Sequence, residues 1–252
     1  MPSLHGDIGR VARRILAQLG KDPRFLLFSG VMPILLVVLL KYVFDAIPVM
    51  RQMGLQLDAY AVPAAGFFIF FITYLLCTIV LVRERRDGTL GRMFAAGYRR
   101  EAIVLGYVAG YSTIALVQTT LVIGATLLVF DVSLGGNAVP VAATTMALSV
   151  VSLSLGLLVS TLARTEGQIF PTIPLIAVPS LLLSGLVIPH GNLPGWLRGV
   201  SYAIPLTYAE RVLLGLLRDG KSFADLAGSL ALLIAYGAGA LAIASLTLRE
   251  VE

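Results

Sequence analysis

Long stretches without a charged residue alternate with short charged segments along this chain. A helix needs about 20 mostly apolar residues to cross the roughly 30 Å of hydrocarbon in a bilayer. Five intervals free of Asp, Glu, Lys and Arg are long enough: 59–82, 102–130, 132–163, 167–197 and 226–248. A sixth, 25–44, contains only Lys41, near an end where a long side chain can reach the interface. The pattern predicts an all-α membrane protein, a single transmembrane domain with six spans at about 25–44, 60–82, 102–130, 138–162, 169–189 and 226–248.

The composition agrees with a membrane protein. Hydrophobic residues make up 58% of the 252 residues and charged residues only 13%, whereas soluble domains have about 25% charged residues. No small-x-small cleavage pattern follows Phe44, so the first stretch is interpreted as a retained span and not a signal peptide. One cysteine, Cys77, and two histidines, His5 and His190, argue against a disulfide framework or a metal site. The net charge of +5 lies mostly beside apolar runs, which favours anionic lipid over nucleic acid as the partner.

The loops indicate the orientation of the spans. An even number of spans places both termini on one side, and Lys and Arg concentrate in cytoplasmic loops. One side holds 13 of the 19 basic residues, from the first 24 residues, the loop 83–101, Arg164 and Arg249. The other side holds six. We expect a multi-pass protein of the plasma or inner membrane with both termini cytoplasmic.

Residues 7–20 have the pattern of an amphipathic helix. Apolar residues recur at helical spacing on one face, from Ile8 to Leu19, and Arg10, Arg13, Arg14 and Gln18 lie on the other. Gly20 and Pro23 then end the helix. It is expected to lie flat on the inner membrane surface, with a helix packed on a partner as the alternative.

The loop 83–101 carries more charge than orientation alone requires. Asp87 can cap a short helix over about 88–97, which Gly97 can end. Its Leu90, Met93 and Phe94 form an apolar edge ringed by charge, which suits a docking surface on a partner. The alternative is a turn with orienting charge, whose apolar edge dips into the membrane.

The region after the fourth span is rich in proline. Pro171, Pro174 and Pro179 lie within the fifth span, which ends near Pro189, and favour a bent helix lining a cavity, with plain packing as the alternative. Residues 190–205 are too short and broken to span. They are expected to form an extracellular re-entrant hairpin in the outer leaflet. The hairpin residues are Pro189, Asn192, Leu193, Pro194, Trp196 and Pro205.

A further helix follows the hairpin. Tyr208, Val212, Leu213, Leu216 and Leu217 share one face, whereas Glu210, Arg211 and Arg218 face elsewhere. This pattern predicts a surface helix, so that the hairpin and surface helix together occupy about 190–220.

The sequence lacks the residues that several kinds of chemistry require. No G-x-x-x-x-G-K-[ST] loop occurs, so the chain cannot hydrolyse ATP by that route. Lys41 is the only ionisable residue within the expected spans, which argues against an ion-coupled carrier. Ser184 and His190 are the one conceivable nucleophile and base, but Pro189 lies between them at a helix end. The chain is therefore expected not to be an enzyme.

Two sequence patterns resemble the ABC-2 family of ATP-binding-cassette permeases, over nearly the whole chain. The first is E-R-x-x-G-T-L with a later Glu and Gly: Glu84, Arg85, Gly88, Thr89, Leu90, Glu101 and Gly106. The second surrounds the hairpin: Ser184, Gly185, Pro189, Leu193, Pro194, Trp196, Leu197, Pro205, Leu206, Thr207 and Tyr208. The chain departs from the family at Gly91, usually acidic, at Ala96-Gly97, usually Thr-Pro, and at Tyr107, often Lys.

The resemblance implies an ABC-2 (type V exporter-like) fold in which two permeases, identical or homologous, pair with two ABC ATPase subunits. The chain itself would bind no cofactor, and ATP and Mg would sit on the partner ATPase. The loop 83–101 would be the coupling helix that inserts into a groove of that ATPase. The residues assigned to this coupling are Glu84, Arg85, Gly88, Thr89, Leu90, Arg92, Met93, Phe94, Arg164 and Glu166.

The cargo is expected to be lipophilic or amphipathic, a drug or a lipid, because the spans carry almost no charge. Similarity to actinobacterial drug-export permeases, including the mycobacterial fluoroquinolone-export type, agrees with this expectation. Candidate path residues, with helix packing as the alternative for each, are Phe67, Phe70, Phe71, Tyr74, Thr78, Ser180 and Ser184. Export of a polysaccharide or lipid-linked sugar is a second hypothesis, and a non-transporting membrane scaffold a third.

Overall fold

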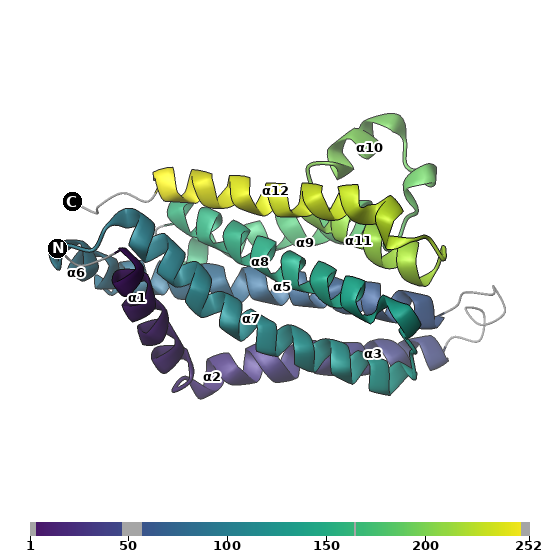
Figure 1. Cartoon of the computed structure of the whole chain (residues 1–252), viewed down its shortest axis with the longest axis horizontal. Coiled ribbons are helices and arrows are strands. Elements are labelled where there is room, and N and C mark those ends of the chain that lie inside the picture. Colours follow the sequence, from purple (N-terminus) through teal and green to yellow (C-terminus); the bar gives the residue numbers. More distant parts are fainter. Residues whose placement is uncertain (1–3, 47–56, 164, 248–252) are drawn as a thin grey trace.

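The structure is a computed structural model, and it describes residues 4–46, 57–163 and 165–247. Those residues form helices and no strand. The long helices are α3 (Met32–Ala46), α5 (Leu57–Arg86), α7 (Arg100–Phe130), α8 (Ala138–Leu162) and α12 (Phe223–Thr247). They lie side by side along one axis, with α1 (Leu4–Leu19), α6 (Thr89–Ala95) and the last turns of α12 at the same end (Figure 1). This arrangement is a bundle of long helices, as in α-helical membrane proteins.

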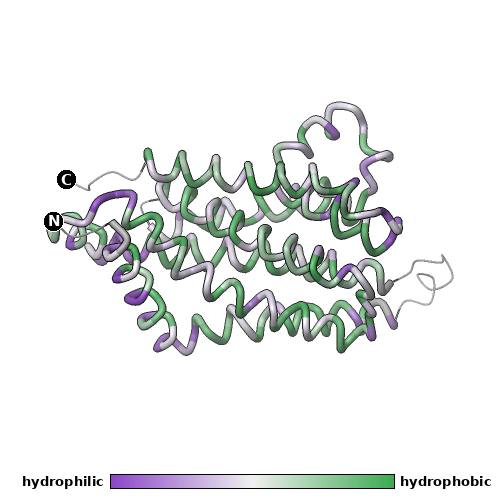
Figure 2. Tube along the Cα trace, in the orientation of Figure 1, coloured by the Kyte–Doolittle hydropathy of each residue, from purple (hydrophilic) through white to green (hydrophobic). Residues whose placement is uncertain are grey.

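Five segments of the described residues are long and apolar enough to cross a membrane. They are Pro23–Val43, Ala59–Arg86, Arg100–Phe130, Gly135–Leu162 and Phe223–Thr247. The first combines α2 (Pro23–Leu26), a π-helical turn at Leu27–Val31 and most of α3. Hydrophobic residues dominate the middle of the bundle and hydrophilic ones gather near its ends (Figure 2). Many large apolar side chains face outward, including Leu128, Leu175 and Leu246, as lipid contact requires.

The expected fifth span is shorter than predicted. Its helix, α9 (Thr172–Leu183), has 12 residues, which extend about 18 Å at 1.5 Å per residue and fall short of the hydrocarbon thickness. Pro171 sits at its N-cap, and Gly185 follows its end with a φ of 99°. A left-handed residue cannot continue a helix, so the apolar sequence up to Pro189 continues without helical structure.

The centre of the bundle is α5, which packs against α3, α7, α8 and α11 (Pro205–Leu217). The closest approach is to α8, where a Cβ added to Gly156 would lie 2.9 Å from the carbonyl oxygen of Tyr74. Only glycine allows this contact between two helix backbones. Small residues at crossings are how membrane helices gain close packing, since lipid offers no hydrophobic drive for association.

The N-terminal helix α1 packs on α7. Its buried residues Val11, Ile15 and Leu19 form its apolar face, and a Cβ on Gly106 would lie 2.5 Å from that of Val11. The chain then turns at Asp22, whose side chain caps α2. The amphipathic pattern is therefore real, but the apolar face is covered largely by this protein's own helix.

The segment predicted as a hairpin, 190–205, and the helix after it differ from each other in their packing. Residues His190–Asn192 form a single 3-10 turn, and α10 (Gly195–Ser201) projects from the side of the bundle (Figure 1). In contrast, α11 packs against α5, α8 and α12. The prediction of a surface helix here is wrong, because ten of the 13 residues of α11 are buried, Glu210 among them.

Candidate functional site

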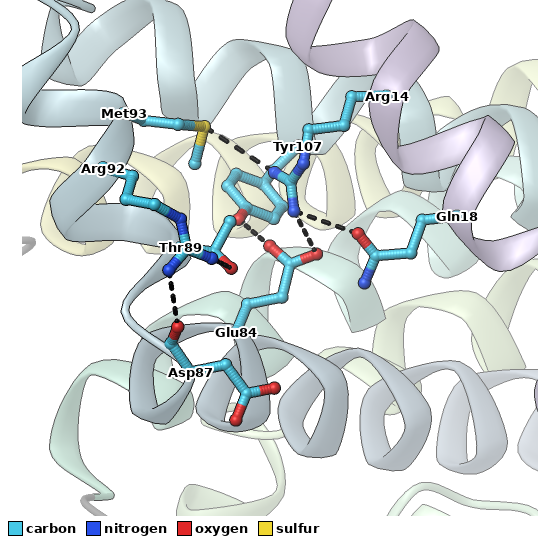
Figure 3. A network of polar contacts seen from close by, with 8 residues as sticks. All are labelled: Arg14, Gln18, Glu84, Asp87, Thr89, Arg92, Met93 and Tyr107. Atoms are coloured by element: carbon cyan, nitrogen blue, oxygen red, sulfur yellow. Dashed lines mark hydrogen bonds and ion pairs between the residues drawn. The ribbon is translucent and has the colours of Figure 1, made fainter.

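The charged loop forms a short helix at one end of the bundle. Gly88, with a φ of 68°, precedes α6 and is its N-cap, so Asp87 does not cap the helix as predicted. The backbone oxygen of Asp87 instead accepts a hydrogen bond from Arg92 at 3.0 Å, and Thr89 accepts a second from the same guanidinium at 2.9 Å (Figure 3). Gly97, with a φ of 81°, follows the helix and reverses the chain.

A buried carboxylate joins three helices beside α6. Glu84, near the end of α5, is only 3% exposed. Its Oε1 accepts a hydrogen bond from Arg14 of α1 at 3.0 Å, and the Tyr107 hydroxyl of α7 donates to its other oxygen (Figure 3). Arg14 also donates to Gln18 at 3.0 Å and contacts the sulfur of Met93 at 3.7 Å. This network fixes α1, α5 and α7 to one another and reaches α6.

The network also keeps Arg14 charged. Burial is the largest influence on the pKa of Arg14 and acts to lower it, but the Glu84 carboxylate and Tyr107 together outweigh burial, so that the pKa is raised above its usual value. Tyr107 stands where the resemblance expects a Lys, and its hydroxyl supplies a hydrogen-bond donor to Glu84. A charged, fully hydrogen-bonded pair is the condition under which a carboxylate is stable away from water.

The apolar edge of α6 faces the bundle. Leu90 is 4% exposed and Met93 7% exposed, and both pack in the cluster that contains Val11 and Ile15 of α1, with Phe94 partly buried against it. The prediction that this apolar edge faces outward as a docking surface is wrong, because α1 and α7 cover it. The exposed face of α6 instead consists of small residues and an arginine: Gly91, Arg92, Ala95 and the following Ala96.

A shallow cavity of about 380 Å³ opens between α1 and α6. The residues that line it are Arg14, Gln18, Thr89, Arg92, Met93, Ala96 and Tyr98. Arg85, another predicted coupling residue, turns away from this surface. Its guanidinium donates to the backbone oxygens of Ser160 at 3.0 Å and Thr161 at 3.2 Å, and so caps the C-terminal end of α8. Arg164 and the side chain of Glu166 lie outside the described residues.

The candidate path residues are mostly packed inside the chain. Phe67, Phe70, Tyr74, Thr78, Ser180 and Ser184 are buried, and Phe71 is half-buried. The rings of Phe67 and Phe71 stack at 6.1 Å, and the Tyr74 hydroxyl lies 3.0 Å from that of Thr172, which links α5 to α9. Six of these seven side chains are therefore enclosed by other described parts of the chain.

The residues of the predicted hairpin differ in their exposure. Leu193 is buried, whereas Trp196 of α10 is 72% exposed. Arg198 donates to the backbone oxygens of Gly191 and Leu193, both at 3.2 Å, and so holds the turn. Burial and the nearby Arg211 lower the pKa of His190, which favours the neutral ring.

Two features of the buried carboxyl groups were not identified from the sequence: the partner of Glu84 and the burial of Glu210. Arg14 lies 70 residues from Glu84, and no local pattern could have paired them. Glu210 is 0% exposed in α11, and neither carboxyl oxygen has a hydrogen-bond partner among the described residues. The sequence did contain a signal for its burial. Leu206 lies four residues before Glu210, Leu213 three residues after it and Leu217 seven residues after it, so that all three share a helix face with Glu210.

Comparisons with known proteins agree on a family. A family model described as "ABC-2 type transporter" matches residues 7–217. "ABC transporter G family member 20" of Dictyostelium discoideum is 31% identical over 145 residues, 58% of this chain and 20% of that protein. "Probable multidrug ABC transporter permease YbhR" of Escherichia coli (strain K12) is 27% identical over 134 residues, 53% of this chain and 36% of that protein.

A third relative aligns over more of the chain. "Linearmycin resistance permease protein LnrN" of Bacillus subtilis (strain 168) is 24% identical over 190 residues, 75% of this chain and 49% of that protein. The alignments thus cover at most about half the length of these relatives.

Proposed function

This chain belongs to the ABC-2 type transporter family, and we propose that it is the membrane-spanning subunit of an exporter driven by ATP hydrolysis on a separate ATPase subunit. Two such permeases, identical or homologous, would pair with two ATPases, which bind the ATP and Mg. Two of the relatives are named as permeases, one for multiple drugs and one for linearmycin resistance. Those names and the nearly uncharged spans support a lipophilic or amphipathic cargo.

The observation that carries the proposal is the attachment of α6. Leu90 and Met93 fix this helix to the bundle, while its opposite face stays exposed. Glu84 joins the adjacent end of α5 to α1 and α7 through Arg14 and Tyr107. A push on the outer face of α6 would therefore move three helices together. The small exposed residues of that face suit close contact with a groove of the ATPase.

The remaining topology follows from the same proposal. The apolar segment from Ile169 to Pro189, with α9 at its centre, would make the sixth crossing. Phe170 and Val187 in its non-helical flanks are exposed in the single chain, so the paired permease would have to shield these flanks from lipid. Both termini would then be cytoplasmic, because the described start of α1 and end of α12 lie at the same end of the bundle as α6 (Figure 1). The hairpin with α10 would lie at the outer leaflet, where Trp196 can reach the headgroups. The path would form between paired permeases near Phe71 and α9.

A substitution on the outer face of α6 tests the coupling. A Cβ on Gly91 meets nothing within 4 Å, so Gly91→Trp should leave the permease folded but block a closely fitting groove. We expect copurification of the ATPase to fall at least about tenfold, which corresponds to about 1.4 kcal/mol of binding free energy, and efflux to fall with it. Leu90 and Met93 are unsuitable, because their substitution would disturb the bundle itself.

The matched control is Gly136→Trp at the opposite end of the bundle. Gly136 is also exposed, and a Cβ there also meets nothing within 4 Å. This variant should retain ATPase binding and efflux. If Gly91→Trp copurifies with the ATPase as well as the control does, α6 is not the docking helix.

A further inference from the structure

The burial of Glu210 is unlike that of any ordinary packing residue. Its side chain is 0% exposed, and both carboxyl oxygens lack a hydrogen-bond partner in the part of the chain that the structure describes. It faces Gly66 of α5, where an added Cβ would lie 3.8 Å from Oε1 of Glu210, 3.3 Å from Leu213 and 3.8 Å from Leu148 of α8. The absence of a side chain at Gly66 makes room for the carboxyl between three helices.

No charged side chain among the described residues is paired with this carboxyl. Neither α8 nor α9 contains a titratable residue. Three tyrosines on the neighbouring helices already have other hydrogen-bond partners. The hydroxyl of Tyr60 accepts a hydrogen bond from Arg218, and that of Tyr74 is hydrogen-bonded to Thr172. The hydroxyl of Tyr236 donates to the backbone oxygen of Ala203. On α11 itself, the Tyr208 hydroxyl donates to the backbone of Tyr202 and Arg211 lies over the ring of Tyr202. The remaining titratable or charged side chains described on α5 and α12 are Cys77, Arg83, Glu84, Arg85, Arg86 and the exposed Asp225.

A carboxylate in such surroundings carries a large desolvation cost, whereas the neutral acid carries a small one. Packed α11 therefore favours the protonated form. A proton is also a ligand that needs no cavity. If α11 separates from α5 and α8, water reaches the carboxyl and the acid releases its proton at neutral pH.

We propose that Glu210 is a proton-binding site, protonated while α11 packs against α5 and α8 and ionised when the bundle opens there. The link to opening rests on the function proposed above, in which ATP moves the helices of the permease. The packed state binds one more proton than the open state, so a rise in pH favours the open state. Repacking requires a proton from the solution that reaches α11, on the side away from α6.

The first measurement does not depend on transport. Infrared difference spectra of the purified chain in lipid bilayers, wild type against Glu210→Gln, should show the carbonyl stretch of a protonated acid at pH 7 only in the wild type. Asp225→Asn, which removes an exposed carboxyl near the same end of the bundle, should leave this band unchanged. If the difference spectra show the bands of an ionised carboxylate in place of the acid band, Glu210 is not protonated and the proposed proton-binding site is wrong.

The second measurement tests the link to transport. With the ATPase in proteoliposomes, wild-type turnover should decrease by up to about tenfold per pH unit as the pH on the outer side rises, because repacking needs the proton. Glu210→Gln should remove this dependence, and Asp225→Asn should keep it. Parallel pH profiles for wild type and Glu210→Gln would refute the link. If no variant shows ATP-dependent export, the proposed function fails, and the infrared result still decides the proton site.

Discussion

Two glutamates are buried in this bundle in opposite ways. Glu84 lies near the end of α5 with an arginine and a tyrosine bonded to its oxygens. Glu210 lies in α11 beside a glycine and two leucines, and neither of its oxygens has a hydrogen-bond partner within residues 4–46, 57–163 and 165–247. The same side chain is thus a fixed charge in one place and a neutral acid in the other. The comparison shows that the surroundings, and not the residue type, decide whether a buried carboxyl holds helices together or can respond to their movement.

Replacing each glutamate with methionine should separate the two cases. For Glu84→Met, the loss of the carboxylate leaves the buried Tyr107 hydroxyl without an acceptor and Arg14 without its counterion. We expect the apparent free energy of unfolding to fall by about 3 kcal/mol, the lower part of the range for a broken buried pair, since Arg14 is partly exposed. Chemical denaturation in detergent micelles measures this change.

The control for this variant is Glu101→Met. Glu101 is exposed in the first turn of α7, paired at 3.6 Å with the exposed Arg99. A surface change of this kind should alter stability by less than about 0.5 kcal/mol. Equal stability of the two variants would mean that the network around Glu84 does not hold the helices.

A smaller effect should follow from Tyr107→Phe. This change removes one hydrogen bond to a charged acceptor and keeps the ring in its packed position, so stability should fall by about 2 kcal/mol. Tyr111, one turn further along α7, provides a matched control, because its buried hydroxyl has no partner among the described residues. Tyr111→Phe should be neutral or slightly stabilising in the same denaturation assay. A loss as large as that of Tyr107→Phe would show that the ring contacts, not the bond to Glu84, set the effect.

Much of the bundle could be predicted from the charge-free intervals. These located α3, α5, α7, α8 and α12, because any helix in hydrocarbon must be apolar over the thickness of the bilayer. The same rule cannot locate breaks within an apolar interval. Residues 167–197 contain no Asp, Glu, Lys or Arg, yet α9 ends at Leu183 before the left-handed Gly185. Composition alone therefore overestimated its length.

The candidate site was predicted less completely, for a related reason. In a soluble protein the apolar face of a helix points inward, but in a membrane protein the lipid-facing and protein-facing sides are both apolar. The apolar edge of α6 could thus be identified, whereas its direction depended on α1, which lies about 70 residues earlier in the chain. The pairing of Arg14 with Glu84 had no local signal either. For Glu210 the leucines around it do carry a signal, but a charged side chain ordinarily indicates exposure, and the two signals conflict.

The smallest expected effect has the opposite sign and decides the comparison. Glu210→Met replaces an unpartnered carboxyl with an apolar side chain of similar length, so that no partner is lost and the cost of burying a polar group is removed. Replacing buried polar groups by apolar ones of similar volume is often stabilising. We expect a gain of about 1 kcal/mol in the same assay, with Glu210→Gln close to the wild type because a buried amide still lacks partners. A loss of stability in Glu210→Met, as in Glu84→Met, would show that Glu210 is bonded within the bundle after all. The two glutamates would then differ only in the identity of their partners.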